Sequence, residues 1–122
     1  MGVYRAEILL SAVAATTTSG SFNVEQFKRV GLQFLAAGIS AGNGVFTVEG
    51  TVDGGNWVAL NTLIDNVANT NVQNLTRVAS KTLSSNTSAI VWLDSLLGLK
   101  AIRVTVTRTT DGSYSAFAIG CE

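Results

Sequence analysis

The stretch Gly44–Leu60, GVFTVEGTVDGGNWVAL, decides the fold of this chain. Phe46 and Val48 fall on one side of an extended strand, whereas Glu49 falls on the other side. The sequence DGGN at 53–56 then reverses the chain, and a return strand begins after it. Alternation with a period of two around a glycine-rich turn is typical of a β-hairpin. The stretch therefore predicts a hairpin, and it shows no reactive group.

A second hairpin is predicted in the last part of the chain, Ala101–Glu122, AIRVTVTRTTDGSYSAFAIGCE. Ile102, Val104 and Val106 alternate with polar residues, and TTDG at 109–112 supplies the turn. Apolar residues that share one face of a strand are expected to point into the core. The predicted core residues are Phe34, Phe46, Val48, Val104, Val106, Phe117 and Ile119.

Extended segments with turn residues between them follow one another along the whole chain. The strands are predicted at Val3–Ser11, Lys28–Ile39, Val45–Val52, Trp57–Leu63, Thr76–Leu83, Ala89–Leu93, Ala101–Thr109 and Ser113–Cys121. Thr16–Ser21 is predicted to be an exposed loop. Short strands at this spacing indicate an all-β fold, which we expect to be a single antiparallel β-sandwich of jelly-roll type with about eight strands.

Two segments carry a helical alternative. Asn23 and Gln26 have the spacing of a capping box, and the apolar residues after them fit a helical stripe as well as a strand. Gly31 and Gly38 each disfavour a helix interior by about 1 kcal/mol relative to alanine. We therefore predict a strand there, and a single helical turn at Asp94–Gly98.

The composition describes one domain, residues 1–122, with a hydrophobic content of 47% and a charged content of 13%. Eight cationic residues balance eight anionic residues, and no basic run is present, so no nucleic-acid partner is expected. A free monomer of this size usually carries more charge for solubility. The low charge favours a surface that is covered by copies of the chain or by partners, the alternative being a soluble domain coated with Thr, Ser and Asn.

Cysteine content and apolar runs give further expectations. Cys121 is the single cysteine, so no intrachain disulfide forms, and synthesis in a reducing cytoplasm is expected. We expect Cys121 to be a small buried hydrophobe at the end of the last strand. No run approaches the roughly 18 apolar residues of a membrane span, and no secretion signal is evident, so no membrane partner is expected.

Residues 1–21 form either an arm that reaches a neighbouring subunit or a first strand followed by a loop.

The residues that could carry catalysis are few. The chain has no histidine, which excludes Ser-His-Asp and Cys-His systems and the usual zinc sites. Glu49, Asp53 and Asp94 could supply a glycosidase pair, but one lies at an outward strand position and two lie at turns. Asp53 and Asn56 are attributed to the tolerance of positive φ in tight turns, and one carboxylate is too few for a calcium loop. We expect no enzymatic activity, no metal and no cofactor.

The aromatic residues offer candidates for ligand or interface contact, namely Trp57, Tyr4 and Tyr114. Exposed aromatic rings that stack on a sugar would make the chain a carbohydrate-binding module. Trp57 follows a turn and is expected to pack back on its own hairpin. Trp92 lies in IVWL at 90–93, which is apolar on both faces, so burial on both sides is expected.

Val48–Trp57, VEGTVDGGNW, resembles the VEGSxDGxxW hairpin that recurs in small β-sandwich proteins of tailed-phage particles. Lys100–Val106, KAIRVTV, followed by Gly112 and a final strand, is similar to the close of that pattern, so the resemblance covers about residues 28–122. A related hairpin occurs in discoidin-like sugar- and lipid-binding sandwiches, but this chain lacks their cysteine pair, extra loop length and secretion signal. The resemblance brings no catalytic residues.

The resemblance implies a phage virion structural protein made in the host cytoplasm. We expect a capsid decoration (cement) protein on the outer capsid surface, which binds the major capsid protein and bridges capsid subunits as a symmetric homo-oligomer such as a trimer. The alternatives are a tail, neck or fibre-associated virion protein and a carbohydrate-binding discoidin-like module.

Attachment is expected to depend on apolar burial, because each exposed ion pair contributes less than about 1 kcal/mol and is screened by salt. The cationic residues expected to form such pairs at the rim are Arg5, Arg77, Lys81, Arg103 and Arg108.

Overall fold

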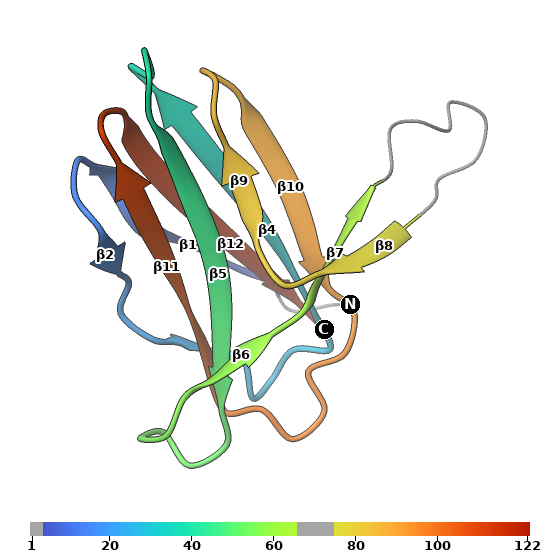
Figure 1. The fold of residues 1–122 in the computed structure, drawn as a ribbon. Helices are drawn as coiled ribbons and strands as arrows, with labels where there is room; N and C mark the ends of the chain where they lie inside the picture. The colour runs from blue at the N-terminus through green and yellow to red at the C-terminus, as the bar shows by residue number, and fades with distance from the viewer. Residues whose placement is uncertain (1–3, 66–74) are drawn as a thin grey trace.

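A computed structural model describes residues 4–65 and 75–122, which form two antiparallel β-sheets packed face to face (Figure 1). Sheet A has the spatial order β1 (Tyr4–Val13), β12 (Ser113–Cys121), β4 (Arg29–Ala37), β10 (Ser88–Leu93), β7 (Thr62–Asp65) and β8 (Leu75–Val78). Sheet B has the order β2 (Thr17–Thr18), β11 (Ala101–Thr109), β5 (Asn43–Thr51) and β6 (Val58–Leu60). Two further strands of sheet B pair with its central strands: β3 (Phe22–Asn23) with β11, and β9 (Lys81–Leu83) with β5. The predicted all-β antiparallel sandwich is confirmed.

The described residues form six strands in each sheet, twelve in all, where the sequence predicted about eight. Two predicted strands are each divided in two because the chain passes from one sheet to the other. The segment predicted at 57–63 becomes β6 in sheet B and β7 in sheet A, and the segment at 76–83 becomes β8 in sheet A and β9 in sheet B. Beyond the body of the sandwich, β7 and β8 extend to one side (Figure 1).

The remaining expectations for local structure have mixed outcomes. The strand predicted over 28–39 is confirmed as β4, so the helical alternative is wrong. The segment predicted as a loop at 16–21 contains β2, which pairs with β11. At Asp94–Gly98 the predicted helical turn is absent. Instead, the Leu99 N–H donates to the Leu96 carbonyl at 3.0 Å, and Gly98 supplies the positive φ, 79°, of a β-turn.

Three aromatic rings join the two sheets at the centre of the core. Phe34 on β4 and Phe46 on β5 stack with 4.3 Å between their ring centroids and an interplanar angle of 8°. The Tyr114 ring on β12 meets Phe46 edge-on, with 6.0 Å between the centroids. Because Phe46 comes from sheet B and the other two from sheet A, these contacts tie the sheets together. The core positions predicted correctly are Phe34, Phe46, Val48, Val104 and Val106.

In the last strand, the side that faces the core is the opposite of the predicted one. Tyr114, Ala116 and Ala118 on β12 are buried, so the alternate residues face outward. Phe117 is only half-buried and Ile119 is 48% exposed, and the prediction that both lie in the core is wrong. The packing of the interior accounts for this: the Tyr114 ring fills part of the space that β12 faces, and small residues follow because core side chains of other segments, such as Phe27 against Gly120, occupy the rest.

Two glycines in neighbouring strands show how different the two sides of sheet A are. At Gly120, which faces inward, an added Cβ would overlap the Phe27 ring. At Gly31, which faces outward on β4, an added Cβ would lie 3.5 Å from Ile119 Cγ2 and 3.9 Å from Trp92 Cδ1, which are ordinary contacts. The inner side is therefore closely packed, whereas the outer side has room.

We predict opposite effects for the same substitution at these two positions. Gly120→Ala forces the core apart and should lower the free energy of unfolding by about 1–3 kcal/mol. Gly31→Ala meets no obstacle and should leave stability unchanged or raise it by up to about 1 kcal/mol, because alanine loses less backbone entropy on folding. Urea unfolding followed by circular dichroism measures both. Equal destabilisation by the two substitutions would contradict the orientation of the sheet.

Candidate functional site

The outer face of sheet A carries exposed apolar side chains on neighbouring strands. Ile8 on β1 is 63% exposed, Ile90 on β10 is 51% exposed and Ile119 on β12 is 48% exposed. Leu35 on β4 is 40% exposed. Single exposed apolar residues are normal on a soluble protein, but a contiguous group on one face marks an interaction surface.

The strand register arranges this face into two rows that cross the sheet. The first row contains Ala6, Ile119, Gly31, Trp92 and Leu63. The second row contains Ile8, Phe117, Gln33 and Ile90. Neither row contains a charged residue, and the second has one polar side chain at its centre. We call these two rows the apolar face.

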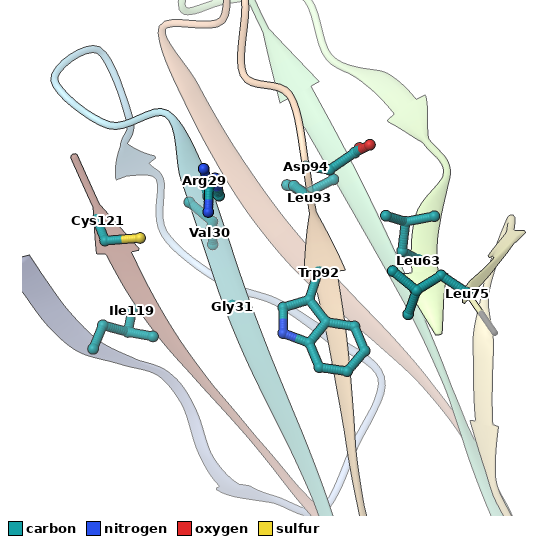
Figure 2. A pocket seen from close by; sticks show the side chains of 10 residues that line it. All are labelled: Arg29, Val30, Gly31, Leu63, Leu75, Trp92, Leu93, Asp94, Ile119 and Cys121. Atoms are coloured by element: carbon teal, nitrogen blue, oxygen red, sulfur yellow. The ribbon is translucent and has the colours of Figure 1, made fainter. Parts of the chain in front are cut away.

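A groove of about 490 Å³ lies on the apolar face. Gly31 has no side chain, and Figure 2 shows Ile119 and Trp92 on either side of it. Leu63 and Leu75 line the groove beyond the indole ring (Figure 2). The missing side chain on β4 therefore creates the hollow, and its walls come from the strands on both sides.

One end of the groove holds its polar groups. Arg29, Asp94 and Cys121 line this end (Figure 2). Asp94 accepts two hydrogen bonds from the Arg77 guanidinium, at 3.0 and 3.4 Å, and so is held in an ion pair. Cys121 is half-buried on the outer side of β12, which corrects the expectation of a buried residue.

Trp92 was expected to be buried on both sides of its strand, and the structure corrects this. Val91 and Leu93 point into the core and are buried. Trp92 is half-buried, and Ile90, which also faces outward, is mostly exposed. A strand that is apolar on both sides is usually covered on both sides, but within the described residues no third layer covers this face.

The candidate aromatic residue Trp57 lies over the other sheet. The Arg103 guanidinium carbon is 4.4 Å from the centre of the Trp57 ring, a cation–π contact. Arg103 Nε also donates to Glu49 Oε1 at 3.0 Å, across the pair of strands β5 and β11. One face of the indole ring is therefore occupied by an arginine, and Glu49 is held in an ion pair.

The two tyrosines have different positions. Tyr114 is completely buried, and its hydroxyl donates to the Asp111 carbonyl at 2.9 Å. Burial and the nearby Asp111 carboxylate raise the pKa of Tyr114. Tyr4 begins β1 opposite Cys121, and its side chain lies outside the described part of the structure.

Asp53 organises the turn that the sequence predicted between β5 and β6. Its carboxylate accepts hydrogen bonds from the Asn56 side chain at 2.6 Å and from the backbone N–H groups of Asn56 and Gly55 at 2.8 Å. These bonds, with a further one from Thr51, hold the pKa of Asp53 far below its usual value. The positive φ belongs to Gly54, at 86°, so Asp53 and Asn56 act through hydrogen bonds and not through left-handed backbone.

Asp111 fastens two loops at one end of the sandwich. Its carboxylate accepts hydrogen bonds from the N–H groups of Ser40, Ala41 and Gly42 at 2.9–3.3 Å. Burial opposes ionisation of Asp111, but these three bonds and the charge of Arg108 outweigh it and lower the pKa. Both aspartates therefore serve structure.

Neither metal binding nor a membrane span has support in the described residues. Across 4–65 and 75–122, no three acidic or cysteine side chains gather closely enough to hold a metal ion, and the sequence has no histidine. No helix in this part of the chain is long and apolar enough to cross a membrane. The apolar face is thus the candidate site.

Comparisons with known proteins identify the fold. No protein-family profile and no curated protein matches the chain. Among solved structures, the SPBc2 prophage-derived protein YomS is 16% identical with a TM-score of 0.68, over 100% of this chain and 96% of that one. The chain has the fold of a phage-derived protein. The PBSX exported protein XepA is 13% identical with a TM-score of 0.67, over 99% of this chain and 38% of that one.

A chain in the structure of infectious bursal disease virus, Gx strain, shares the fold more distantly. It is 8% identical with a TM-score of 0.53, over 98% of this chain and 32% of that chain. The phage-derived and viral neighbours agree with the resemblance that the hairpin sequence gave. At these identities the agreement concerns the fold.

The lowered pKa values of Asp53 and Asp111 predict acid sensitivity. Both carboxyls bind protons less readily in the folded chain than in the unfolded chain, so stability falls as the pH falls. Their contribution is complete above about pH 5 and is lost as the pH drops through the usual carboxyl range toward the lowered values. We expect the urea midpoint to decline over this interval. Asp111→Asn should begin lower at neutral pH and decline less, and a wild-type midpoint that does not change in acid would contradict this assignment.

Proposed function

We propose that this chain is a non-enzymatic structural protein of a phage particle. The observation that carries the proposal is the full-length match to a prophage-derived protein, which covers nearly all of both chains. The state of the carboxylates is consistent with a protein that does no chemistry. Glu49 and Asp94 are held in separate ion pairs, and Asp53 is engaged in its own turn.

Within the particle we propose the role of a capsid decoration (cement) protein on the outer capsid surface. Its partner would be the major capsid protein, and it would stabilise the shell by bridging capsid subunits as a symmetric homo-oligomer such as a trimer. Such a role requires contact by shape and apolar burial, both with the shell and between copies of the chain, and the apolar face with its groove can supply one of these two contacts. The arm formed by residues 1–21 stays a prediction, since a single chain does not test it.

The jelly-roll connectivity is also part of the proposal. Successive strands alternate between the sheets, with β1 in sheet A, β2 and β3 in sheet B, β4 in sheet A and β5 in sheet B. The first and last strands, β1 and β12, are neighbours, and β4 follows them in the same sheet. This order supports the two-sheet arrangement that jelly rolls adopt in virus capsids.

An image reconstruction of the particle that contains this chain tests the proposal. Hundreds of copies on the shell would support decoration. About a dozen copies or fewer at the tail or neck would replace decoration with the tail, neck or fibre alternative. Absence from the particle, together with glycan binding that is lost in Trp57→Ala, would overturn the proposal in favour of a carbohydrate-binding module.

Attachment through apolar contacts predicts resistance to salt. Ion pairs at the rim, such as Arg77 with Asp94, are exposed and screened, whereas apolar burial is not. We expect the chain to stay in its assembly at about 0.5 M NaCl, where the Debye length is roughly 4–5 Å. Sedimentation measures this. Complete release at that salt with the fold intact would contradict attachment by burial.

A further inference from the structure

We infer that the apolar face binds the apolar face of a second copy of this chain, across a two-fold axis. The inference rests on the proposed function only in that it gives a surface to the proposed homo-oligomer, and it specifies a two-fold dimer in place of a trimer. It names the occupant of the groove, which neither the fold nor the comparisons assign.

The charge of the face limits what can bind there. Its two rows, from Ala6 to Leu63 and from Ile8 to Ile90, contain no charged residue. The charged groups beside the face are few, because Arg77 is paired with Asp94 and Arg29 lies at one end of the groove, so a nucleic acid, an anionic lipid headgroup or a highly charged peptide would find little there to pair with. A second copy matches this neutral chemistry, and the balanced total of eight positive and eight negative charges means that two copies do not repel each other.

The one polar side chain on the face also favours a second copy. Gln33 is exposed and lies between Phe117 and Ile90 in the second row. An amide carries both donors and an acceptor, so the Gln33 amides of two symmetry-related copies can bond each other. A purely apolar partner would leave the donors and the acceptor of Gln33 without hydrogen bonds. A two-fold contact brings the same patch of both copies together, which is the arrangement this pairing requires.

The size of the face indicates how strong the contact is. The five strands are about 4.8 Å apart and the two rows about 6.8 Å apart, which gives a projected area of roughly 300 Å². A standard interface buries about 800 Å² per partner. The face therefore suits a weak dimer with a dissociation constant in about the micromolar range.

Two other parts of the surface are less suited to self-association. One edge strand of sheet A is β1, whose register against β12 shifts twice, between Ile8 and Leu10 and between Leu10 and Val13. Such irregularities protect an edge strand from pairing with another chain. On the outer face of sheet B, Thr105 bonds Thr18 at 2.9 Å and other polar groups pair among themselves.

Sedimentation equilibrium of the purified chain tests the inference, from about 1 μM to about 200 μM, a range that brackets a micromolar dissociation constant. The wild type should rise from the monomer mass toward twice that mass. Ile119→Lys and Ile90→Lys should each weaken association at least about tenfold, because each would bury an unpaired ammonium group. Thr107→Lys, on the outer face of sheet B, adds the same charge and should behave as the wild type. Circular dichroism checks that every variant is folded.

Several outcomes would overturn the inference. A wild type that stays monomeric over the whole range would do so, as would a dimer that survives both substitutions on the apolar face. If the chain is monomeric but Ile119→Lys abolishes its binding to particles, the occupant is a shell protein instead of a second copy. In that case the proposed decoration role stands while the dimer does not, so the two failures are distinguishable.

Discussion

The position of Tyr114 in the core is the constraint on which the rest of the molecule depends. Its ring is completely buried, meets Phe46 edge-on and occupies the space that a side chain at Gly44 would need. Because side chains alternate along a strand, burial of this ring fixes which residues of β12 face outward. Phe117 and Ile119 are then obliged to lie on the outside.

From this constraint follows the difference between the two outer faces. Sheet B presents threonines and an arginine–glutamate pair, as a solvated sheet does. Sheet A presents isoleucines, Phe117 and Trp92 around a hollow at Gly31. The space in front of β12 is filled by the Tyr114 ring and by core side chains of other segments, such as Phe46 and Phe27, so the large side chains at 117 and 119 have no place inside. A face of this kind gains free energy when another surface covers it, at roughly 25 cal/mol for each Å² of apolar area buried.

Much of the architecture could be predicted from sequence, because regular alternation determines which side of a strand is buried. In β5 and β11 the apolar residues alternate with polar ones, and their inner faces were correctly identified. In β12 and β10 both sides of the strand are apolar or small, so alternation cannot tell the inner side from the outer. Side-chain volume decided it, as the contact between Gly120 and the Phe27 ring shows.

The groove could not be predicted for a related reason. It depends on Gly31 lying beside Ile119 on one strand and Trp92 on another, which is a matter of register between strands distant in sequence. The divided strands at 57–63 and 76–83 had the same cause, since nothing local marks the point where a chain changes sheets. Trp57 was found as a candidate, but its arginine partner came from a strand more than forty residues away.

Trp92 itself offers the most direct test of the account, because it lies on the apolar face and only one other tryptophan is present. In Trp57→Phe, the fluorescence of Trp92 can be followed while the protein concentration rises through the micromolar range expected for a weak interface. The account predicts a shift of the emission to shorter wavelength and protection from an aqueous quencher as association proceeds. Emission and quenching that stay constant while the mean mass of the dissolved protein increases would show that the chain associates through another surface, and would contradict the account.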